Sequence, residues 1–531
     1  MIPAFVALLA PRAIAVLGAS DDPVKIGGRP LAFLLRYRYA GNVCPVNPSR
    51  RTVQGVPAFA SIAEVPAPVD LAVVVVPAEA VEPALEASAA HGVRAAIVFS
   101  SGFAELGAAG REAQARLTAL AHRTGLRIVG PNCQGLAHLP TRLMATFASG
   151  FLDEPLCIGP IAMVSQSGAM AGMLYELARI QGLGLNYWVS TGNEADVQAA
   201  DILGEVVADG DTRVAVLLSR GREGRGALPR GTRARDDHGV AVFVLKSGRS
   251  AQGRRAAASH TGSLAGEDAV YDAVFRDWGA LRAADPADLL RLPQAFLRYR
   301  EAGPRVAILS NSGGLGVLSV DLCVDLGLVP AEFSPRPPPA SARPCPTSRR
   351  HENPVDLTAA DPHRSRHAHA GAAAARSRSR RGHDRLPGCP RRLGHRRRAL
   401  RPRRGPVAAS THKVVAMSCP QPHVVALFRE AGVLAFDDST VALRSLACLA
   451  DVTRRRPRWR ARLAAAAAAP APTVVPSPRG GGARSRPTAF SASGRAGAGS
   501  SPSGCRWWRV GSPPIPTRRR PRPTRSAIQW W

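Results

Sequence analysis

The sequence predicts an α/β fold, organised as three stacked units that are each built around a mostly parallel sheet. Over the first 330 residues, short β-branched runs alternate with stretches of helical period, which is the pattern of βαβ units. The run DLAVVVVP at 70–77 is apolar without alternation, as expected of a parallel strand covered on both faces. A strand, a small-residue turn and a helix also begin three times, at 13, 161 and 305. Three stacked α/β units are therefore the simplest interpretation.

The first unit has the pattern of a doubly wound nucleotide-binding domain. Its apolar and β-branched runs predict five strands, at 13–18, 42–46, 70–76, 95–100 and 127–130. Between them, apolar residues at helical spacing predict helices at 28–39, 78–91 and 109–125.

The second unit begins after a connector at 147–160. It has predicted strands at 161–165, 185–190, 213–219 and 240–246, and predicted helices at 169–182 and 197–208. The third unit begins with RVAILSNSGG at 305–314, and a helix is expected at 315–327. Both units therefore repeat the strand, turn and helix order of the first.

The net charge of +31 is confined to the C-terminal part of the chain. Residues 1–335 hold 31 basic and 31 acidic side chains, whereas residues 336–531 hold 39 and 8. This distribution excludes a uniformly basic nucleic-acid-binding protein. An alternative is an Arg-rich nucleic-acid binder that uses only the tail. Four tryptophans there could stack on bases: Trp507, Trp508, Trp530 and Trp531. The tail has no recognisable nucleic-acid-binding module, however, so a nucleic-acid partner is not expected.

Beyond residue 335 the composition stops resembling that of a packed domain. Segments 362–407 and 457–531 consist mainly of Arg, Ala, Pro, Gly and Ser, and they lack an apolar period. Between and before them, residues 351–362 and 422–452 have an ordinary composition. One interpretation is that disordered linkers surround small ordered pieces. The other is a disturbed reading frame in a GC-rich gene, with residues 222–237 as a shorter, earlier instance.

The nine cysteines are scattered and form no CxxC pair, which argues against a zinc module or a disulfide framework, and no metal site is expected. The longest apolar runs fall well short of the ~20 residues that cross a bilayer, so no membrane partner is expected. The opening MIPAFVALLAP has no positive region and is followed at once by a strand, unlike a secretory signal. We expect a reducing, cytoplasmic setting.

Small residues follow several of the predicted strands, at the sheet edge where open α/β sheets bind ligands. VLGASDDPVKIGG at 16–28 would let a phosphate-bearing ligand approach the backbone, although it is not GxGxxG and so disfavours a nicotinamide cofactor. VNPSR at 46–50 places Arg50 where a second phosphate can bind. SSGFAE at 100–105 and GPNCQG at 130–135 add two further turns. Each motif alone is also compatible with an ordinary tight turn.

The second and third units contain matching Ser/Gly turns. MVSQSGAMAG at 163–172 places Ser165 and Ser167 at a helix start, and LSNSGGLG at 309–316 places Ser310, Ser312 and Gly313 equivalently. Backbone N–H groups and hydroxyls at a helix start suit an anion. The alternative is that each turn merely caps its helix. Because the same turn occurs twice in the chain, coincidental capping is the less attractive explanation.

A single histidine lies in a small-residue segment, KSGRSAQGRRAAASHTGSLAGED at 246–268. We expect a loop here, between a strand and a helix, in which the imidazole of His260 can move. Most isolated histidines are structural or merely exposed. An imidazole nitrogen is nevertheless a nucleophile near neutral pH and can carry a phosphoryl group.

Taken in order, these motifs resemble the NDP-forming acyl-CoA synthetases, relatives of the succinyl-CoA synthetase α subunit. The resemblance rests on LLAPRAIAVLGASDDPVKIGG, DLAVVVVPAEAV, SSGFAE, GPNCQG, MVSQSGAMAG, STGNEADV, VLKSGRS and SHTGSLAG. It implies a Rossmann-like CoA-binding domain at 5–146 and a flavodoxin-like ligase domain at 158–295. It further implies a second ligase domain at 303–456, disrupted at 336–350 and 362–412, before a disordered tail at 457–531.

The resemblance also implies the roles of individual residues. His260 would be phosphorylated during turnover, and phosphate would bind at two helix starts, at Ser167, Gly168, Ser312 and Gly313. Coenzyme A would bind in the first domain, at Gly18, Ser20, Asp21, Arg50, Ser100, Ser101 and Gly102. The substrates would be CoA, a small carboxylic acid and ATP or ADP, with Mg²⁺ on a partner ATP-grasp domain.

Two departures from the family pattern leave an alternative open. The family pairs its histidine with a Glu just after the strand at 213–219, but this chain has SRGREG there, and Glu223 lies in the stretch of doubtful frame. No ATP-grasp domain is recognisable after residue 456, so a separate β-type chain would supply it or the domain has been lost. The alternative is a catalytically inactive CoA-binding scaffold from a truncated or frame-shifted gene.

Overall fold

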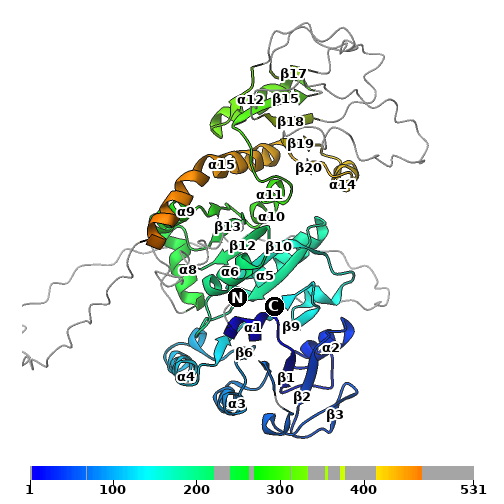
Figure 1. The fold of residues 1–531 in the computed structure, drawn as a ribbon, viewed down its shortest axis with the longest axis vertical. Helices are drawn as coiled ribbons and strands as arrows, with labels where there is room; N and C mark the ends of the chain where they lie inside the picture. Colours follow the sequence, from blue (N-terminus) through cyan, green and yellow to red (C-terminus); the bar gives the residue numbers. More distant parts are fainter. Residues whose placement is uncertain are drawn as a thin grey trace, which may run out of the picture. The chain divides into compact units, whose positions relative to one another are not determined.

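The computed structural model describes residues 3–66, 68–220, 239–261, 268–310, 312–332, 353–356, 371–376 and 414–468. All described residues lie in one compact unit, Met1–Ala469. This unit contains sheets of five, seven and six strands and a two-stranded hairpin (Figure 1). The predicted tail beyond 468 and most of the two predicted disruptions lie outside the described residues.

The first sheet is parallel throughout and has the order β2-β1-β5-β6-β7. Its strands are β1 Ala13–Leu17, β2 Asn42–Val46, β5 Leu71–Val74, β6 Ala95–Val98 and β7 Arg127–Val129. Its helices are α1 Pro3–Leu9, α2 Arg29–Arg36, α3 Ala78–Ala90 and α4 Ala108–Thr124, with short turns η1 Ile62–Glu64 and η2 Ala104–Leu106 and the hairpin β3 Thr52–Val53 and β4 Val56–Pro57. The five strands and three helices expected from periodicity are confirmed. All residues of β1, β5 and β6 are buried, as their apolar runs predict.

The second sheet has the order β14-β13-β12-β10-β11-β8-β9. Its strands are β8 Gly135–His138, β9 Leu143–Thr146, β10 Ile158–Ser165, β11 Leu185–Ser190, β12 Val214–Ser219, β13 Ala241–Lys246 and β14 Leu281–Arg282. Its helices are α5 Gly168–Ile180, α6 Ala199–Ala208, α8 Ala251–Thr261, α9 Asp268–Trp278, α10 Asp288–Arg291 and α11 Gln294–Arg298, with the turn η3 Ser149–Leu152. Four strands and two helices expected here are confirmed.

Strands β8 and β9 lie in the second sheet, although we expected the first domain to extend to residue 146. They form an antiparallel hairpin that pairs with β11. Without them β11 would be an edge strand with unpaired backbone groups, and all six of its residues are buried. The chain therefore leaves the first sheet after β7 and joins the second sheet at residue 135.

The two faces of the second sheet are covered by different helices. Along β10, Ile161 and Met163 belong to one apolar cluster with residues of α5, whereas Ala162 and Val164 belong to another with residues of α6. Both helices contact β10 (Figure 1). This alternation is the period of two expected of a strand that is buried on both faces. Because helices cover both faces, a ligand would have to bind at the carboxyl ends of the strands.

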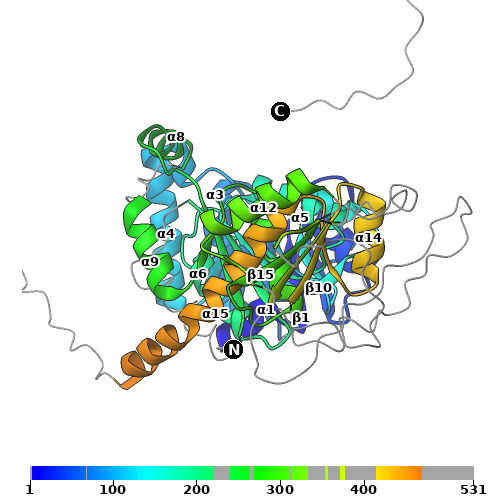
Figure 2. The same ribbon diagram turned by 90° about the horizontal axis from the view of Figure 1, so that it is seen from above.

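The third sheet has the order β16-β15-β18-β19-β20, with β17 also pairing with β15. Its strands are β15 Arg305–Ser310, β16 Val329–Pro330, β17 Val355–Asp356, β18 Gly371–Arg376, β19 Val414–Ser418 and β20 Leu434–Phe436. Helices α12 Gly313–Asp325 and α15 Ser439–Ala468 pack against it and each other (Figure 2), and α14 Pro422–Glu430 lies on β20.

Two expectations for this region were wrong. Strand β18, GAAAAR, lies inside the segment expected to be disrupted, and it runs antiparallel to both β15 and β19. Alanine has little strand propensity, so pairing on both sides must stabilise this strand. Helix α15 continues to residue 468, past the expected start of the tail at 457, because Trp459 is buried and its Nε1 donates to the carbonyl of Arg276, 3.3 Å away. The alanines that follow are strong helix formers.

Candidate functional site

The first predicted ligand loop begins at Gly18, immediately after β1. Gly18 has a φ of +81°, and a Cβ added to it would lie 2.4 Å from the carbonyl oxygen of Val75. The N–H groups of Gly18 and Ala19 both donate to the carbonyl of Val46, at 3.1 and 3.2 Å. Only glycine can occupy this position, because β2 and β5 approach the loop closely on both sides of β1.

The structure brings Arg50 next to Asp21, which directly follows Ser20. Arg50 Nη1 lies 3.1 Å from Asp21 Oδ2, and the side chains are 55% and 45% exposed. Exposed ion pairs contribute little stability, so this pair can open toward a ligand. Gln54, which no motif indicated, holds the loop by donating its backbone N–H to Asp21 Oδ1 and its Nε2 to the carbonyls of Ser20 and Gly28.

The loop after β6 uses two of its predicted ligand contacts internally. Ser100 Oγ donates to the carbonyl of Val76, 2.5 Å away. The N–H groups of Gly102 and Phe103 donate to Glu105 Oε1, at 2.7 and 3.2 Å. Ser101 is exposed. The carboxylate of Glu105 therefore organises this loop, and Ser101 is the predicted residue whose side chain faces solvent.

These loops share one edge of the first sheet. Residue 18 follows β1, residue 50 lies shortly after β2 and residue 100 shortly after β6, and the strands stand in the order β2-β1-β5-β6. Parallel strands end at the same edge. All seven predicted CoA-binding residues therefore lie at the carboxyl edge where such sheets bind ligands.

The two Ser/Gly turns have the same geometry. Ser165 Oγ donates to the carbonyl of Ser167 at 2.8 Å and accepts from its N–H at 3.0 Å, and Ser310 makes the same bonds with Ser312 at 2.8 and 3.1 Å. Ser167 and Ser312 each cap their helix by accepting from the N–H three residues further on, at 3.5 and 3.4 Å. The structure shows a serine cap at both helices, whose first residues are Gly168 and Gly313, and anion binding there stays a prediction.

The GPNCQG turn contacts the start of α5. A Cβ on Gly168 would lie 2.7 Å from Cγ of Gln134, so the turn can approach only because residue 168 is glycine. The backbone N–H of Gln134 also donates to Ser190 Oγ at 3.2 Å, at the end of β11. Cys133 in the same turn is buried, and burial raises its pKa to about 12, so its thiol stays protonated and unreactive. This contact joins the first-domain edge to the predicted phosphate site.

His260 lies in a helix, whereas we expected a loop. Helix α8 spans Ala251–Thr261, so the backbone of His260 is in its last turn. Alanine and arginine favour helix, and Ser250 Oγ accepts from the N–H of Gly253 at 3.0 Å near its start. The helix contacts η2 of the first sheet's unit. The side chain of His260 and residues 262–267 lie outside the described residues. That the imidazole reaches Gly168 and Gly313 therefore stays a prediction.

A cluster of one buried and two partly buried charges lies between the end of β13 and the start of α9. Lys246, at the end of β13, is 1% exposed, and its Nζ lies 3.7 Å from Asp268 Oδ1 and over the ring of Tyr271. Arg282 Nη2 donates to Asp268 Oδ1 at 2.6 Å. Burial raises the pKa of the Asp268 carboxyl, but Arg282, Lys246 and Arg249 outweigh burial and hold it below its ordinary value. We call Lys246, Asp268 and Arg282 the base clamp, since it joins the residues before α8 to the start of α9.

The position of the expected Glu partner is occupied differently. Ser219 ends β12, the backbone N–H of Arg220 donates to Gln166 Oε1, and Glu223 lies outside the described residues. A different carboxylate lies nearby. Glu194, with a φ of +59°, accepts hydrogen bonds from Gln166 Nε2 at 2.9 Å, Thr191 Oγ1 at 2.7 Å and a backbone N–H at 2.8 Å. Glu194 belongs to the STGNEADV motif, and no role was predicted for it from the sequence.

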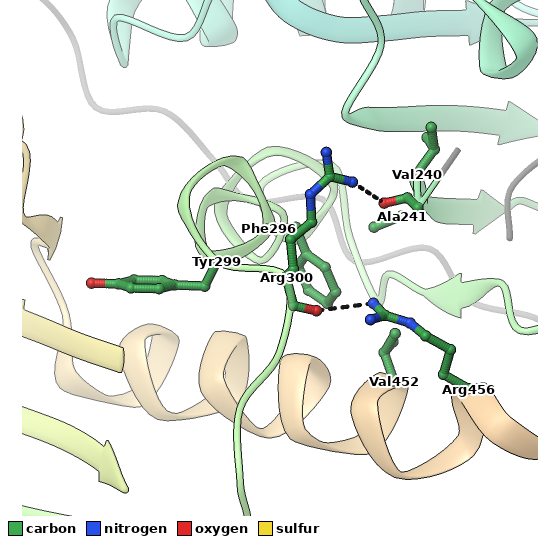
Figure 3. Close-up of a pocket in the computed structure, with 8 residues that line it drawn as sticks. Val240, Ala241, Phe296, Tyr299, Arg300, Val452 and Arg456 are labelled. Carbon is green, nitrogen blue, oxygen red and sulfur yellow. Dashed lines mark hydrogen bonds between the residues drawn. The ribbon is translucent and has the colours of Figure 1, made fainter. Parts of the chain in front are cut away.

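A small cavity lies apart from these loops. It is found where β13 begins, next to α15, and Figure 3 shows Arg300 donating to the carbonyl of Gly239 and Arg456 donating to the carbonyl of Arg300. None of the predicted site residues lines it, and it is at the amino end of β13. Among the described residues, no three His, Cys, Asp or Glu side chains are placed to hold a metal ion, and no helix is long and apolar enough to cross a membrane.

Comparison with known proteins places the chain among CoA ligases. A CoA binding domain model matches residues 12–139, and a succinyl-CoA ligase like flavodoxin domain model matches residues 158–296. The alpha subunit of ADP-forming acetate–CoA ligase II from Pyrococcus furiosus is 37% identical over 353 residues, which cover 66% of this chain and 75% of that protein. The ADP-forming acetate–CoA ligase from Methanocaldococcus jannaschii is 33% identical, with 65% of this chain and 48% of that protein covered.

A solved structure agrees with these sequence matches. The dinucleotide-forming acetyl-coenzyme A synthetase 1 from Ca. Korarchaeum cryptofilum, in complex with phosphate and ADP, has a TM-score of 0.68 at 28% identity, covering 86% of this chain and 99% of that chain. The Rossmann-like and flavodoxin-like sheets described above thus have the fold and order of those proteins. The chain belongs to the family of NDP-forming acyl-CoA synthetases, as a relative of the alpha subunits of ADP-forming acetate–CoA ligases.

Proposed function

We propose that the chain is the α-type chain of an acyl-CoA synthetase that interconverts acyl-CoA, NDP and phosphate with acid, CoA and NTP. The observation that supports this most directly is the contact of Gln134 with Gly168, which joins the carboxyl edge of the first sheet to the start of α5. A thioester bound at the first edge would thereby lie next to phosphate at the second. A small carboxylic acid is the proposed acyl substrate.

The proposed CoA site fits a ligand that carries phosphates. Gly18 provides close backbone approach, and Arg50 provides a half-exposed guanidinium whose partner Asp21 can be displaced. Ser20, Ser100, Ser101 and Gly102 complete the proposed edge, with the Ser100 hydroxyl and the Gly102 N–H serving to hold the loop. The residues present are therefore compatible with coenzyme A.

The proposed reaction uses His260 as a phosphoryl carrier. Phosphate oxygen attacks the thioester carbonyl, the C–S bond breaks, and the products are acyl phosphate and CoA. A neutral imidazole nitrogen of His260 then attacks phosphorus, and the acid leaves as carboxylate. The helix starts at Ser167, Gly168, Ser312 and Gly313 stabilise the charge on the phosphoryl oxygens. NDP would finally accept the phosphoryl group on an ATP-grasp domain, and Mg²⁺ held by that domain would neutralise the nucleotide phosphates.

We assign the ATP-grasp domain to a separate β-type chain, because the relatives that this chain covers best are alpha subunits. This chain covers 75% of an alpha-subunit relative but 48% of the longer relative from Methanocaldococcus jannaschii. We also propose a reducing, cytoplasmic setting, which is compatible with the free state of all six described cysteines. The sequence SRGREG, which stands after β12 where the family has its Glu, supports a second candidate, an inactive CoA-binding scaffold.

Labelling separates the two functions. The full chain is incubated with acetyl-CoA and radiolabelled phosphate, alone and with the β chain of a two-subunit relative, and the phosphohistidine is quantified. We expect label on the wild type and none on His260→Ala. His122→Ala is the matched control, because His122 is exposed on α4. Calorimetric CoA binding without label in any sample would support the scaffold, and the absence of CoA binding would contradict both functions.

A further inference from the structure

A segment of the second domain lies along the edge of the first sheet. The N–H groups of Asn193, Ala195 and Val197 donate to the carbonyls of residues 131, 130 and 128, at 2.9, 2.9 and 3.0 Å. Residues 193–197 therefore lie along β7 and the turn that follows it, attached by their backbone N–H groups. Asp196 strengthens this docking with an ion pair to Arg127 at 2.8 Å. The loop after β11 is thus attached to both sheets.

Glu105 connects this docked segment to the loop after β6. Its Oε1 accepts from the N–H groups of Gly102 and Phe103, and its Oε2 accepts from Asn193 Nδ2 at 2.5 Å. Gln114 supports the contact, since its Oε1 lies 3.1 Å from the same Asn193 Nδ2. One carboxylate therefore contacts two loops that belong to different domains.

The residue that follows Asn193 continues the connection toward the phosphate site. Glu194 Oε2 accepts from Gln166 Nε2, and Gln166 Oε1 accepts from the N–H of Arg220. Gln166 stands between Ser165 and Ser167, whose hydroxyls shape the start of α5. A continuous series of hydrogen bonds and adjacent residues thus runs from the loop after β6 to the ends of β11, β10 and β12.

The charge on Glu105 makes this connection strong. Burial raises the pKa of its carboxyl, but hydrogen bonds from Asn193, Gly102 and Phe103 outweigh burial and hold the pKa below its ordinary value. The carboxylate is therefore ionised at neutral pH. Hydrogen bonds to an ionised acceptor are about twice as strong as neutral ones.

We propose that Glu105 is a positioning residue that aligns the CoA-side loop 100–105 with the phosphate-side loops through Asn193. This inference rests on the proposed function, because it assigns the first edge to CoA. Glu105 touches neither reacting atom; it sets the register between the two half-sites. We call the CoA-side loops the first half-site and the phosphate-side loops the second. Loss of the Glu105 charge should slow formation of acyl phosphate from acyl-CoA, which needs both half-sites. It should spare transfer of the phosphoryl group from acyl phosphate, which needs only the second.

The variant Glu105→Gln isolates this role. Its carbonyl oxygen can still accept from residues 102 and 103, while its NH₂ group would face the NH₂ group of Asn193. Glu112→Gln is the matched control, since Glu112 is exposed on α4 and the substitution makes the same change of charge. The double variant Glu105→Gln with Asn193→Asp restores a donor opposite an acceptor, and Asn132 can still donate to residue 193.

The kinetic test compares two phosphoryl sources in the presence of the β chain. Labelled acetyl phosphate needs only the second half-site, whereas acetyl-CoA with labelled phosphate needs both. For Glu105→Gln we expect phosphorylation from acetyl-CoA to fall about tenfold, the factor that corresponds to one lost charge-assisted hydrogen bond of about 1.4 kcal/mol. Phosphorylation from acetyl phosphate should stay near the wild-type rate. Glu112→Gln should match the wild type. The double variant should recover only part of the loss, because Asn193→Asp also removes the donor to Gln114 Oε1.

Hydrogen exchange gives a readout that needs no turnover. On CoA binding, we expect amide exchange in residues 191–199 to slow in the wild type and in Glu112→Gln. In Glu105→Gln, protection should stay confined to the first-domain loops. Equal loss with both phosphoryl sources, or unchanged protection of 191–199 in Glu105→Gln, would overturn the inference while leaving the proposed function intact. Failure of the wild type to bind CoA would instead overturn the proposed function and this inference with it.

Discussion

Replacing Asp268 by Asn tests the base clamp that joins the strand before α8 to the helix after it. The substitution removes the negative charge that faces Lys246 Nζ at 3.7 Å and Arg282 Nη2 at 2.6 Å. The Lys246 side chain is fully buried, so its ammonium cannot recover hydration. Removing one partner of a buried pair costs about 3–5 kcal/mol, and we expect about 3 kcal/mol here because Asp268 is 22% exposed.

The variant Lys246→Met is the comparison, because it removes the other partner of the same pair. Asp268 would keep its bond to Arg282, and Met fills most of the volume of the Lys side chain. The carboxylate of Asp268 stays paired with Arg282, and the cost of burying an ammonium is removed, so we expect a loss below about 1 kcal/mol. The clamp therefore predicts an asymmetry between the two variants.

Hydrogen exchange under native conditions measures the asymmetry locally, in peptides that cover β13 and α9. The pH dependence provides a second check. Because the pKa of Asp268 is lowered in the folded state, its contribution is present above the ordinary value of about 4 and is lost as pH falls through the folded pKa. The difference between the wild type and Asp268→Asn should therefore shrink at acidic pH. Equal losses in the two variants at neutral pH would refute the reasoning.

Three further predictions concern single sites. Gly18→Ala should lower the free energy of unfolding, measured with urea, by at least about 2 kcal/mol, because a positive φ is strained for alanine and the carbonyl oxygen of Val75 leaves no room for a Cβ. It should also weaken CoA binding. Normal CoA affinity would contradict the prediction. Burial lowers the pKa of His138, so the folded state disfavours the charged imidazole. The free energy of unfolding should therefore fall as pH drops below about 6.5, and His138→Phe should remove this fall. An identical pH profile in the variant would contradict the prediction. Ser167→Ala and Ser312→Ala should each lose about 1 kcal/mol of stability as helix caps, and a neutral result for either would reject capping there.

The element pattern of the first 330 residues could be predicted because it is local. Strand burial produces apolar runs such as 71–74, and helix burial produces a period near four, so both appear in short windows of sequence. The loops at 18–21 and 100–102 could be found because glycine and serine after a strand mark its carboxyl end. Segment 251–261 was misjudged as a loop, since its small residues favour a helix as much as a flexible turn.

The contacts between the sheets were decided by the tertiary structure. Glu105 meets a side chain 88 residues away, and Gln134 meets Gly168 across two domains. Such pairs have no periodicity, because each partner is an ordinary polar or small residue within its own segment. The pairing of residues 135–146 with β11 likewise satisfies an edge that exists only once the second sheet has formed. Local composition thus determined which elements form and where ligand loops lie, whereas long-range hydrogen bonding and close packing determined which loops act together.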